Sequence, residues 1–327
     1  MKIIAAIIGM GIGQKHLDAI DNYKKSFVKI ICEKNDKKIK SLKKKYPDKI
    51  ITKNENVIFK DPSINLVSIA SYDNFHYSQV IKSLKFNKNI IVEKPMCLKF
   101  DQLIEIHKIL KKKKNIKMIS NLVLRVNSLF KEFKKRIDKK NIFYVEADYV
   151  WGRKKKLFEW RSKVKDYSLI LGAGIHIIDL VMWILGSRPI SVTTFSNKKS
   201  TIKSKFKKNS LYVMLFEFPS KVLVKITANG AAVHNHFHEM KIFSKNETLV
   251  HSNLGTYSYK GEKLNKIYKS YPDKKNRKKL IQNFIDNLIN PKVKNFISHQ
   301  EQFDLMSACF YAEKSAMLNK KIKIKYL

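Results

Sequence analysis

The stretch IIAAIIGMGIGQKH, residues 3–16, decides the fold of this chain. Six apolar residues predict a buried strand, glycines follow at 9, 11 and 13, and residues 15–23 have the spacing of an amphipathic helix. Glycines in such a turn let the backbone approach a phosphate group, which the N–H groups and the positive dipole end of the helix would bind. Because the spacing is GxGxG and not GxGxxG, an ordinary tight βα turn stays the alternative.

Outward from this turn, the first 118 residues alternate β-rich apolar runs with amphipathic stretches. This alternation predicts βαβ units and a parallel sheet. We expect Asp36 and Asp101 to cap two of the helices. The expected strands are 3–8, 28–32, 66–70, 90–92 and 117–119, and the expected helices are 15–23, 36–46, 75–86 and 101–112.

The pattern changes after about residue 120. A helix is expected at 128–137, and another begins in a glycine-rich stretch near Gly172. The longer strands predict a mainly antiparallel sheet. We therefore expect an α/β protein with two domains, residues 1–120 and residues 121–327. The expected later strands are 142–150, 191–195, 211–217, 222–228 and 236–243, and the closing helices are 280–289 and 300–318.

The formal net charge of +40 raises the question of a nucleic-acid partner. Only six of the 67 basic residues are arginine, and the lysines occur in short scattered groups such as 43–45, 111–114 and 154–156. Base readout depends on arginine, so we favour a compositional bias over a dedicated nucleic-acid surface. The charge should still attract acidic or phosphate-bearing ligands and cause weak polyanion binding at low salt.

The composition also limits where the protein works. Hydrophobic residues make up 44% of the chain, and no apolar run approaches the roughly 20 residues that span a bilayer. The amino terminus runs straight into glycines with no cleavage site, which argues against a signal peptide. Cys32, Cys97 and Cys309 are few and far apart, so no disulfide framework or metal site is indicated. We expect a cytoplasmic protein without a membrane partner.

Two charged residues follow predicted strands of the parallel sheet. Glu33 comes about twenty residues after the glycine turn, where a carboxylate would bind the adenosine ribose and repel a 2′-phosphate, so NAD is favoured over NADP. Lys34 beside it keeps NADP open. Lys94 lies in the run Ile90–Pro95, which ends a predicted strand, and ligands of such sheets bind outside the carboxyl ends of the strands. Lys94 is thus expected to act on a substrate oxygen, the alternative being a solvated strand-end lysine.

His234, His236 and His238 alternate along the chain and would share one face of a strand. This geometry suits zinc, but no matching cysteine or carboxylate set accompanies it. We therefore expect these histidines to line a cleft or a polar interface, and we expect no metal site.

Several motifs together resemble the glucose-fructose oxidoreductase, inositol dehydrogenase and rhizopine-catabolism (Gfo/Idh/MocA) family. The resemblance covers nearly the whole length, and its most specific part is Glu93-Lys94-Pro95 followed about eighty residues later by Gly-x-His-x-x-Asp. The matching pieces are His16 after the glycine turn, Ser71–His76, Val92–Pro95, Trp160-Arg161, Gly174–Asp179 and Trp183–Gly186.

The resemblance implies a Rossmann domain, then an α+β domain with an open-faced, mainly antiparallel sheet that often serves oligomerisation, here a homodimer or homotetramer. It also implies reversible oxidation of a secondary alcohol on a sugar or cyclitol. The implied catalytic residues are Lys94, His176 and Asp179. The implied substrate contacts are Lys94, Asn121, Arg125 and His176. The implied cofactor contacts are Gly9, Met10, Gly11, Ile12, Gly13, Glu33, Ser71, Asn74, His76, Glu93, Lys94 and Arg161.

The chain departs from the family pattern at two places. Many members carry an aspartate four residues before the helix histidine, where this chain has Gly172. Asp179, one turn after His176, could replace that partner or could serve contacts between domains. The turn after the third main strand is Ser71-Tyr72-Asp73 in place of Thr-Pro-Pro. A buried core histidine stays the alternative for His176.

We expect an NAD-dependent oxidoreductase that transfers a hydride between nicotinamide and a secondary alcohol or ketone of a sugar, sugar nucleotide or cyclitol. His176 would exchange the hydroxyl proton and the Lys94 ammonium would stabilise the alkoxide, or the two would act in reverse. The alternatives are an NAD-using glycoside hydrolase of the same family and a non-catalytic NAD-binding protein.

Overall fold

The computed structural model describes residues 2–327, which form two compact units. The first unit ends its main segment at Val123 and also contains Lys274–Gln302. The second unit consists of Leu124–Asp273 and Phe303–Leu327. Sequence analysis assigned every residue after 120 to the second domain, whereas residues 274–302 pack with the first.

The sheet of the first unit has six parallel strands in the order β3-β2-β1-β4-β5-β6. The strands β1, β4, β5 and β6 are almost continuously buried, as expected for a parallel sheet covered on both faces. The order turns back between β1 and β4, which makes this a doubly wound sheet with its carboxyl ends on one edge. The strands are β1 Ile3–Ile8, β2 Ser26–Cys32, β3 Ile50–Thr52, β4 Leu66–Ile69, β5 Asn89–Val92 and β6 Met118–Ser120.

Amphipathic helices cover this sheet. In α5, for example, the buried residues are Leu103, Ile106 and Leu110, which recur at helical spacing on one side. The helices are α1 Gly13–Asp21, α2 Asp36–Lys45, α3 Asn56–Lys60, α4 Asp73–Lys85, α5 Phe100–Lys112 and α9 Asn276–Ile289. Sequence analysis did not predict β3 or α3.

Two expected helix caps are wrong. The cap of α2 is Asn35, whose side chain accepts a hydrogen bond from the Lys38 N–H, and the residue before α5 is Lys99, which makes no side-chain cap. Asp36 and Asp101 lie within the first turns instead, where a carboxylate still meets the positive end of the helix dipole.

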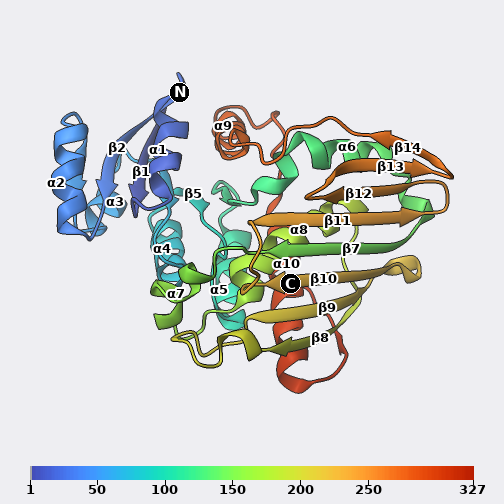
Figure 1. Cartoon of the computed structure of the whole chain (residues 1–327). Coiled ribbons are helices and arrows are strands. Elements are labelled where there is room, and N and C mark those ends of the chain that lie inside the picture. Colours follow the sequence, from blue (N-terminus) through green and yellow to red (C-terminus); the bar gives the residue numbers. More distant parts are fainter. Residues whose placement is uncertain (1) are drawn as a thin grey trace. The chain divides into compact units, whose positions relative to one another are not determined.

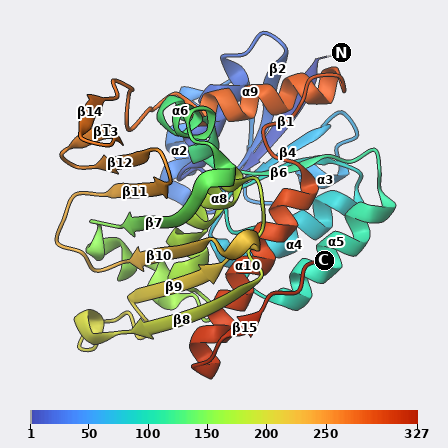
Figure 2. The ribbon, with the colours of Figure 1, turned by 90° about the vertical axis from the view of Figure 1, so that its right-hand side faces the viewer.

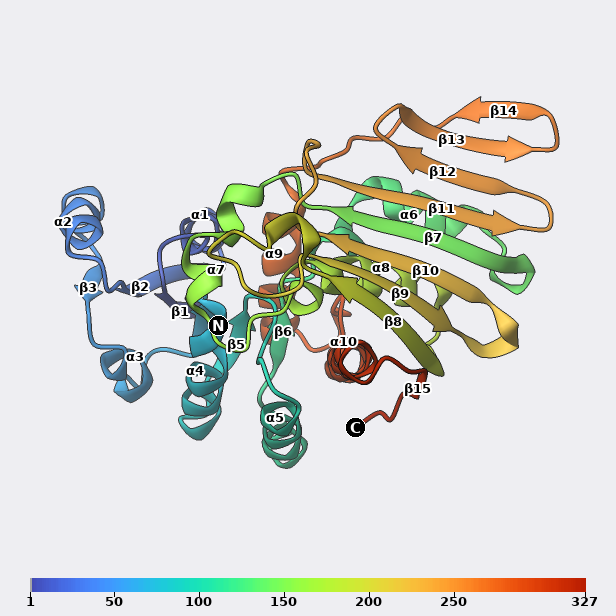
Figure 3. The ribbon, with the colours of Figure 1, turned by 60° about the horizontal axis from the view of Figure 1, so that its bottom comes forward.

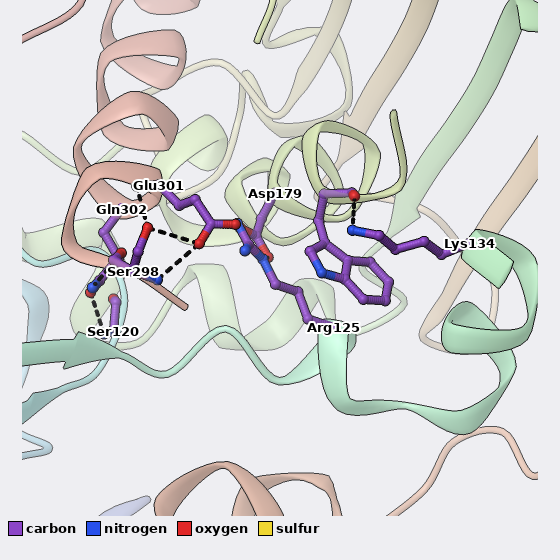
Figure 4. A network of polar contacts seen from close by, with 8 residues as sticks. Ser120, Arg125, Lys134, Asp179, Ser298, Glu301 and Gln302 are labelled. Atoms are coloured by element: carbon purple, nitrogen blue, oxygen red, sulfur yellow. Dashed lines mark hydrogen bonds and ion pairs between the residues drawn. The ribbon is translucent and has the colours of Figure 1, made fainter. Parts of the chain in front are cut away.

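The returning segment 274–302 is tied to the first unit by polar contacts. Asp286 of α9 accepts hydrogen bonds from Tyr23 and Lys25, beyond the end of α1, and Figure 2 shows α9 beside the first strands. At the start of α10 (His299–Leu318), the Gln302 amide donates to the Met118 carbonyl and accepts from the Ser120 N–H in β6. Figure 4 shows this contact between Gln302 and Ser120.

The sheet of the second unit has nine strands in the order β14-β13-β12-β11-β7-β10-β9-β8-β15. All neighbours are antiparallel except β7 and β10. The strands are β7 Ile142–Val150, β8 Ser191–Asn197, β9 Leu211–Glu217, β10 Leu223–Asn229, β11 Phe237–Ser244, β12 Thr248–Ser252, β13 Gly255–Lys260, β14 Lys263–Lys266 and β15 Ile322–Lys323. The predicted fold class is confirmed, although β12 to β15 were not predicted.

Helices lie on one face of this sheet and leave the other face uncovered (Figures 1 and 3). They are α6 (Ser128–Arg136), α8 (Ile175–Leu185) and most of α10, while α7 (Trp160–Lys163) is a single turn. The strands alternate accordingly: in β9, Tyr212, Met214 and Phe216 are buried and the residues between them are not. None of the helices formed by residues 2–327 combines the length and apolarity of a bilayer-spanning helix.

Candidate active site

The three glycines of the first turn have different structural roles. Gly9 has φ +88°, and a Cβ there would lie 2.7 Å from the Ala70 carbonyl, so only glycine fits this close crossing of two strand ends. Gly13 packs the start of α1 against Ile7 and Ala70. A Cβ on Gly11 would meet nothing within 4 Å. The turn thus leaves open backbone at Gly11, beside the amino end of α1, where a pyrophosphate could approach.

The Glu33 carboxylate accepts a hydrogen bond from the backbone of the same turn. Its Oε2 accepts a hydrogen bond from the Met10 N–H at 3.0 Å, and its Oε1 accepts from the N–H groups of Lys34 and Asn35 at 2.8 and 3.0 Å. The Lys38 ammonium lies 3.9 Å from Oε2. Since a carboxylate oxygen has two lone pairs, Oε2 keeps one for a further donor such as a ribose hydroxyl.

Three of the predicted cofactor contacts follow β4: Ser71, Asn74 and His76. Their side chains differ in how accessible they are to a ligand. His76 is fully buried, and its ring nitrogens contact the Pro95 carbonyl at 2.7 Å and the Ser71 carbonyl at 3.1 Å. It therefore joins the turns that follow β4 and β5, and its expected cofactor contact stays a prediction. Asn74 is exposed in the first turn of α4, and its cofactor role, like that of Ser71, stays a prediction.

Glu93 lies at the end of β5 in a buried polar cluster. The His16 Nε2 is 3.1 Å from its Oε1, and the Asn121 amide donates to the same oxygen at 2.5 Å. The other His16 nitrogen meets the Ser68 hydroxyl at 2.8 Å. Both nitrogens of the His16 ring are thus engaged, Nε2 by the Glu93 carboxylate and Nδ1 by the Ser68 hydroxyl.

The Arg277 guanidinium, from the returning segment, reaches Glu93 at 3.7 Å. Burial by itself raises the pKa of Glu93, but the His16 hydrogen bond and the positive charges of His16, Arg277 and Lys94 outweigh it, so the pKa is lowered well below its usual range. Glu93 is thus an anion at the end of β5, next in sequence to the half-buried Lys94. Sequence analysis did not single out Arg277, because nothing local links residue 277 to residue 93.

In the second unit, His176 stands out on α8. From Tyr167 to Met182, His176 is the one residue that is not buried. Its ring stacks on that of Tyr149 from β7, with centroids 6.0 Å apart and planes within 10°. His176 is half-buried on an otherwise buried helix, and its catalytic role stays a prediction. Tyr149 was not predicted, although its inward position on the predicted strand 142–150 is a usable signal.

Many family members have an aspartate at the position of Gly172, four residues before His176. In this chain the space for a side chain there is occupied by another residue. Gly172 lies in a π-helical turn, Ile170–Gly174, one turn before His176. A Cβ on Gly172 would lie 2.1 Å from the Tyr167 hydroxyl oxygen. The phenol of Tyr167, itself packed edge-on to Trp160 and Phe206, therefore takes the space that a side chain at 172 would need.

Asp179 of α8 forms an ion pair with Arg125. Its oxygens accept hydrogen bonds from Arg125 at 2.6 to 2.9 Å, and both side chains are 2% exposed or less (Figure 4). This bidentate pair fixes α8 against residue 125. It also places Arg125 in a buried pair. The catalytic role expected for Asp179 and the substrate roles expected for Arg125 and for Asn121, which is buried on Glu93, stay predictions.

The three alternating histidines do not form one cluster of ligands. His238 in β11 is buried against the Tyr271 hydroxyl, His236 contacts the Trp151 carbonyl at 3.1 Å, and His234 is exposed on the preceding loop. Burial lowers the pKa of both His236 and His238. Within residues 2–327, no group of three or more His, Cys, Asp or Glu side chains is arranged to hold a metal ion.

Comparison with protein families gives two matches. Residues 3–121 match the family described as oxidoreductase family, NAD-binding Rossmann fold. Residues 134–304, more than half of the chain, match the companion description, oxidoreductase family, C-terminal alpha/beta domain. A curated relative, an uncharacterised oxidoreductase of Synechocystis sp., is 21% identical over 57% of this chain, and the match spans 52% of that relative.

Two solved structures share the whole fold. The myo-inositol 2-dehydrogenase of Lactobacillus plantarum has a TM-score of 0.86 at 17% identity, covering 99% of this chain and 100% of that one. The scyllo-inositol dehydrogenase of Lactobacillus casei, solved with NAD(H) and scyllo-inositol, has a TM-score of 0.83 at 16% identity, covering 99% of both chains. The expected resemblance is confirmed: this chain belongs to the Gfo/Idh/MocA family of oxidoreductases.

Proposed function

We propose that this oxidoreductase uses NAD to interconvert a secondary alcohol and a ketone on a sugar, sugar nucleotide or cyclitol. The observation that supports it most is the shared edge of the parallel sheet. There β1 leads into the open glycine turn, and β5 leads into Glu93 and Lys94. Strand ends beside a switch point are where such sheets bind their ligands. The inositol dehydrogenase neighbours support the substrate class as an analogy of fold.

The residues of the first unit fit a dinucleotide. Gly11 offers open backbone beside the amino end of α1, and Glu33 keeps a lone pair for a ribose hydroxyl. When bound, nicotinamide supplies the hydride acceptor or donor. Glu33 would disfavour a 2′-phosphate through like-charge repulsion, while Lys34 and Lys38 act in the opposite direction.

The Lys94 ammonium would bond the substrate oxygen and stabilise the alkoxide that forms during oxidation. His176 would hold or accept the hydroxyl proton, and Tyr149 would keep the imidazole in one orientation by stacking. Glu93 would help to position the neighbouring Lys94, because its anionic carboxylate is fixed by His16 and Asn121.

The experiment is NADH formation from a panel of sugars and cyclitols. We expect turnover by the wild type, a loss of about 10² to 10⁴ in kcat for Lys94→Ala, and a smaller loss of roughly 10² for His176→Asn. NAD affinity should change by less than tenfold in both. Lys60→Ala, an exposed lysine at the end of α3, is the matched control.

Normal kcat in Lys94→Ala would refute the proposed role of this lysine. Glycoside cleavage without net NADH would identify the hydrolase alternative, and NAD binding without turnover of any compound would identify a binding protein.

We also propose a homo-oligomer formed through the uncovered face of the nine-stranded sheet. This face exposes Phe195, Leu215 and Leu223, each by 45% or more. Apolar side chains grouped on an open sheet face are typical of an interface between copies. Light scattering should show a dimer or tetramer that Phe195→Glu/Leu215→Glu converts to monomer. Leu254→Glu, on an exposed turn, should leave it intact.

A further inference from the structure

Helix α9 of the returning segment runs beside α1 in the same direction. The Gln282 amide donates to the Ala19 carbonyl at 3.4 Å. Farther along α9, Asp286 accepts from Tyr23, just beyond the end of α1, at 2.6 Å. Because both helices rise about 1.5 Å per residue, the start of α9 is level with the first turn of α1. That turn follows the open backbone of Gly11, so the amino ends of the two helices lie side by side next to the glycine turn.

Arg277, in the first turn of α9, approaches the Glu93 carboxylate without forming a hydrogen bond. Its Nε lies 3.7 Å from Glu93 Oε1, and the side chain is 23% exposed. This Nε is shielded from water and has no hydrogen-bond partner, and no hydrogen bond within residues 2–327 uses the terminal nitrogens. Since an arginine carries five N–H donors, the Arg277 guanidinium keeps them for a ligand. Glu93 also meets His16 of α1, which brings the guanidinium close to the start of that helix.

A second polar group beside Glu93 is unpaired. The Asn121 side chain is 1% exposed, and its nitrogen donates to the same Oε1 that Arg277 approaches. Only this nitrogen can donate to a carboxylate, which fixes the amide and leaves its Oδ1 buried without a hydrogen-bond partner. Buried polar atoms are almost always hydrogen-bonded in folded proteins. An unfilled donor and an unfilled acceptor at one carboxylate therefore indicate a bound group that offers both.

The charges at the start of α9 oppose the helix dipole. Helices α2 and α5 carry an aspartate in the first turn and lysines in the last turn, as the dipole favours. In α9, Arg277, Lys278 and Lys279 occupy the first turn, no acidic residue accompanies them there, and no side chain caps the helix. A lysine-rich composition does not explain this reversed order. A bound anion would relieve the repulsion between these cations and the positive end of the helix.

We propose that Arg277 binds the pyrophosphate of the dinucleotide cofactor, together with the glycine turn at residues 9–13. This inference rests on the proposed function, because it concerns the same cofactor. A phosphate is favoured over a water molecule because a guanidinium, a cationic helix end and the open backbone of Gly11 come together here. The ribose hydroxyls of the same nucleotide are donors of the kind that Asn121 Oδ1 lacks. Arg277 would then share its charge between the cofactor and Glu93, the neighbour of Lys94.

Calorimetric titration with NAD, NADH and ADP-ribose tests this contact, because ADP-ribose keeps the pyrophosphate and lacks nicotinamide. We expect Arg277→Met to raise Kd for all three by about tenfold to a hundredfold, as for a hydrogen bond to a charged group. Arg277→Lys should recover only part of the affinity, since an ammonium lacks the planar fork of donors. Lys292→Met, at an exposed position just after α9, removes the same charge and should leave Kd unchanged.

A second pair of variants separates a direct contact from an effect through Glu93. In the Glu93→Gln background, Arg277→Met should raise Kd by at least as large a factor as in the wild type, because the guanidinium no longer faces a carboxylate there. Loss of the effect in that background would show that Arg277 only neutralises Glu93, and would overturn the proposal. Equal Kd for ADP-ribose in the wild type and Arg277→Met, or an equal rise in Lys292→Met, would overturn it too. Urea denaturation checks that each variant is folded.

The same titrations distinguish failure of this inference from failure of the proposed function. If the wild type binds NAD and turns over a substrate, but Arg277→Met has the wild-type Kd, only the role of Arg277 fails. If the wild type binds none of the dinucleotides, the proposed function fails, and inorganic pyrophosphate still decides the anion contact. Saturable binding of pyrophosphate that disappears in Arg277→Met but not in Lys292→Met supports the contact. Absent binding, or equal binding in both variants, refutes it.

Discussion

The two units each bury a carboxylate near their candidate catalytic residue, and they neutralise it differently. Asp179 of the second unit receives a bidentate guanidinium from Arg125 at 2.6 to 2.9 Å. Glu93 of the first unit is held by the His16 imidazole and the Asn121 amide, with Arg277 at 3.7 Å. A closed ion pair fixes a helix. A carboxylate held by an imidazole and an amide, with its arginine farther away, keeps negative charge at a strand end beside Lys94.

The two carboxylates should respond most differently when the arginine beside each is removed. Arg125→Met takes away the guanidinium that neutralises Asp179 and should cost about 3–5 kcal/mol of unfolding free energy. Arg277→Met leaves Glu93 with His16 and Asn121 and should cost only about 1 kcal/mol. Urea denaturation measures both, and Arg125→Met/Asp179→Leu should recover most of the loss. Equal losses for the two single variants would show that the two carboxylates are neutralised alike.

A third carboxyl group, on Glu313, differs from both because no arginine among residues 2–327 pairs with it. Glu313 in α10 is half-buried with its Oε1 shielded from water, and burial raises its pKa from 4.5 to about 7. The folded state then binds a proton more tightly than the unfolded state, so stability falls as pH rises from about 4.5 to 7. The full loss is about 3 kcal/mol.

Glu313→Gln should remove that loss, making the variant more stable than the wild type at pH 8 and similar at pH 4. Denaturation at both values measures it. Glu262→Gln, on an exposed turn, is the control and should leave the pH dependence unchanged. A wild-type stability that rises between pH 5 and 7 by the same amount in Glu313→Gln would contradict the assigned cause.

A carboxylate added at Gly172 tests the space beside His176. The backbone there does not have positive φ, but the Cβ of Gly172→Asp would meet the Tyr167 hydroxyl at 2.1 Å. We expect a loss of about 1–3 kcal/mol from overpacking. In a Tyr167→Ala background the same substitution should cost less, and the pH-rate profile of the double variant then reports whether the new carboxylate raises the pKa of His176. Unchanged stability in Gly172→Asp alone would show that Tyr167 moves freely.

The smallest expected effect concerns Glu33, a carboxylate held by backbone N–H groups. Glu33→Gln removes the charge that would repel a 2′-phosphate and should shift the ratio of kcat/KM for NAD over NADP by about tenfold toward NADP. Steady-state kinetics with both cofactors measures it. An unchanged ratio would mean that the contacts with Met10, Lys34 and Asn35 already occupy the carboxylate.

Much of the first unit could be predicted from the sequence. Strands 3–8 and 90–92 and the turn at residues 9–13 were placed within a residue or two, because apolar runs and glycines are local signals. Parallel topology then puts Gly11, Glu93 and Lys94 at one edge without any knowledge of side-chain contacts. The short β3 and α3 were missed since their few residues carry little periodicity.

Several side-chain contacts of the second unit could not be predicted from the sequence pattern. His176 was recognisable from its motif, but its stacking on Tyr149, the filling of Gly172 by Tyr167, and the capture of Asp179 by Arg125 depend on side chains from separate elements. So does the return of residues 274–302 to the first unit, which brings Arg277 to Glu93.

The fold class, the family and the positions of the glycine turn, Lys94 and His176 could be read from the sequence, because local periodicity and short motifs record them. Which charged groups are neutralised, and by which partners, depends on the tertiary structure. A carboxylate or an arginine is defined by its partner across the fold, and that partner is chosen by packing, not by spacing along the chain.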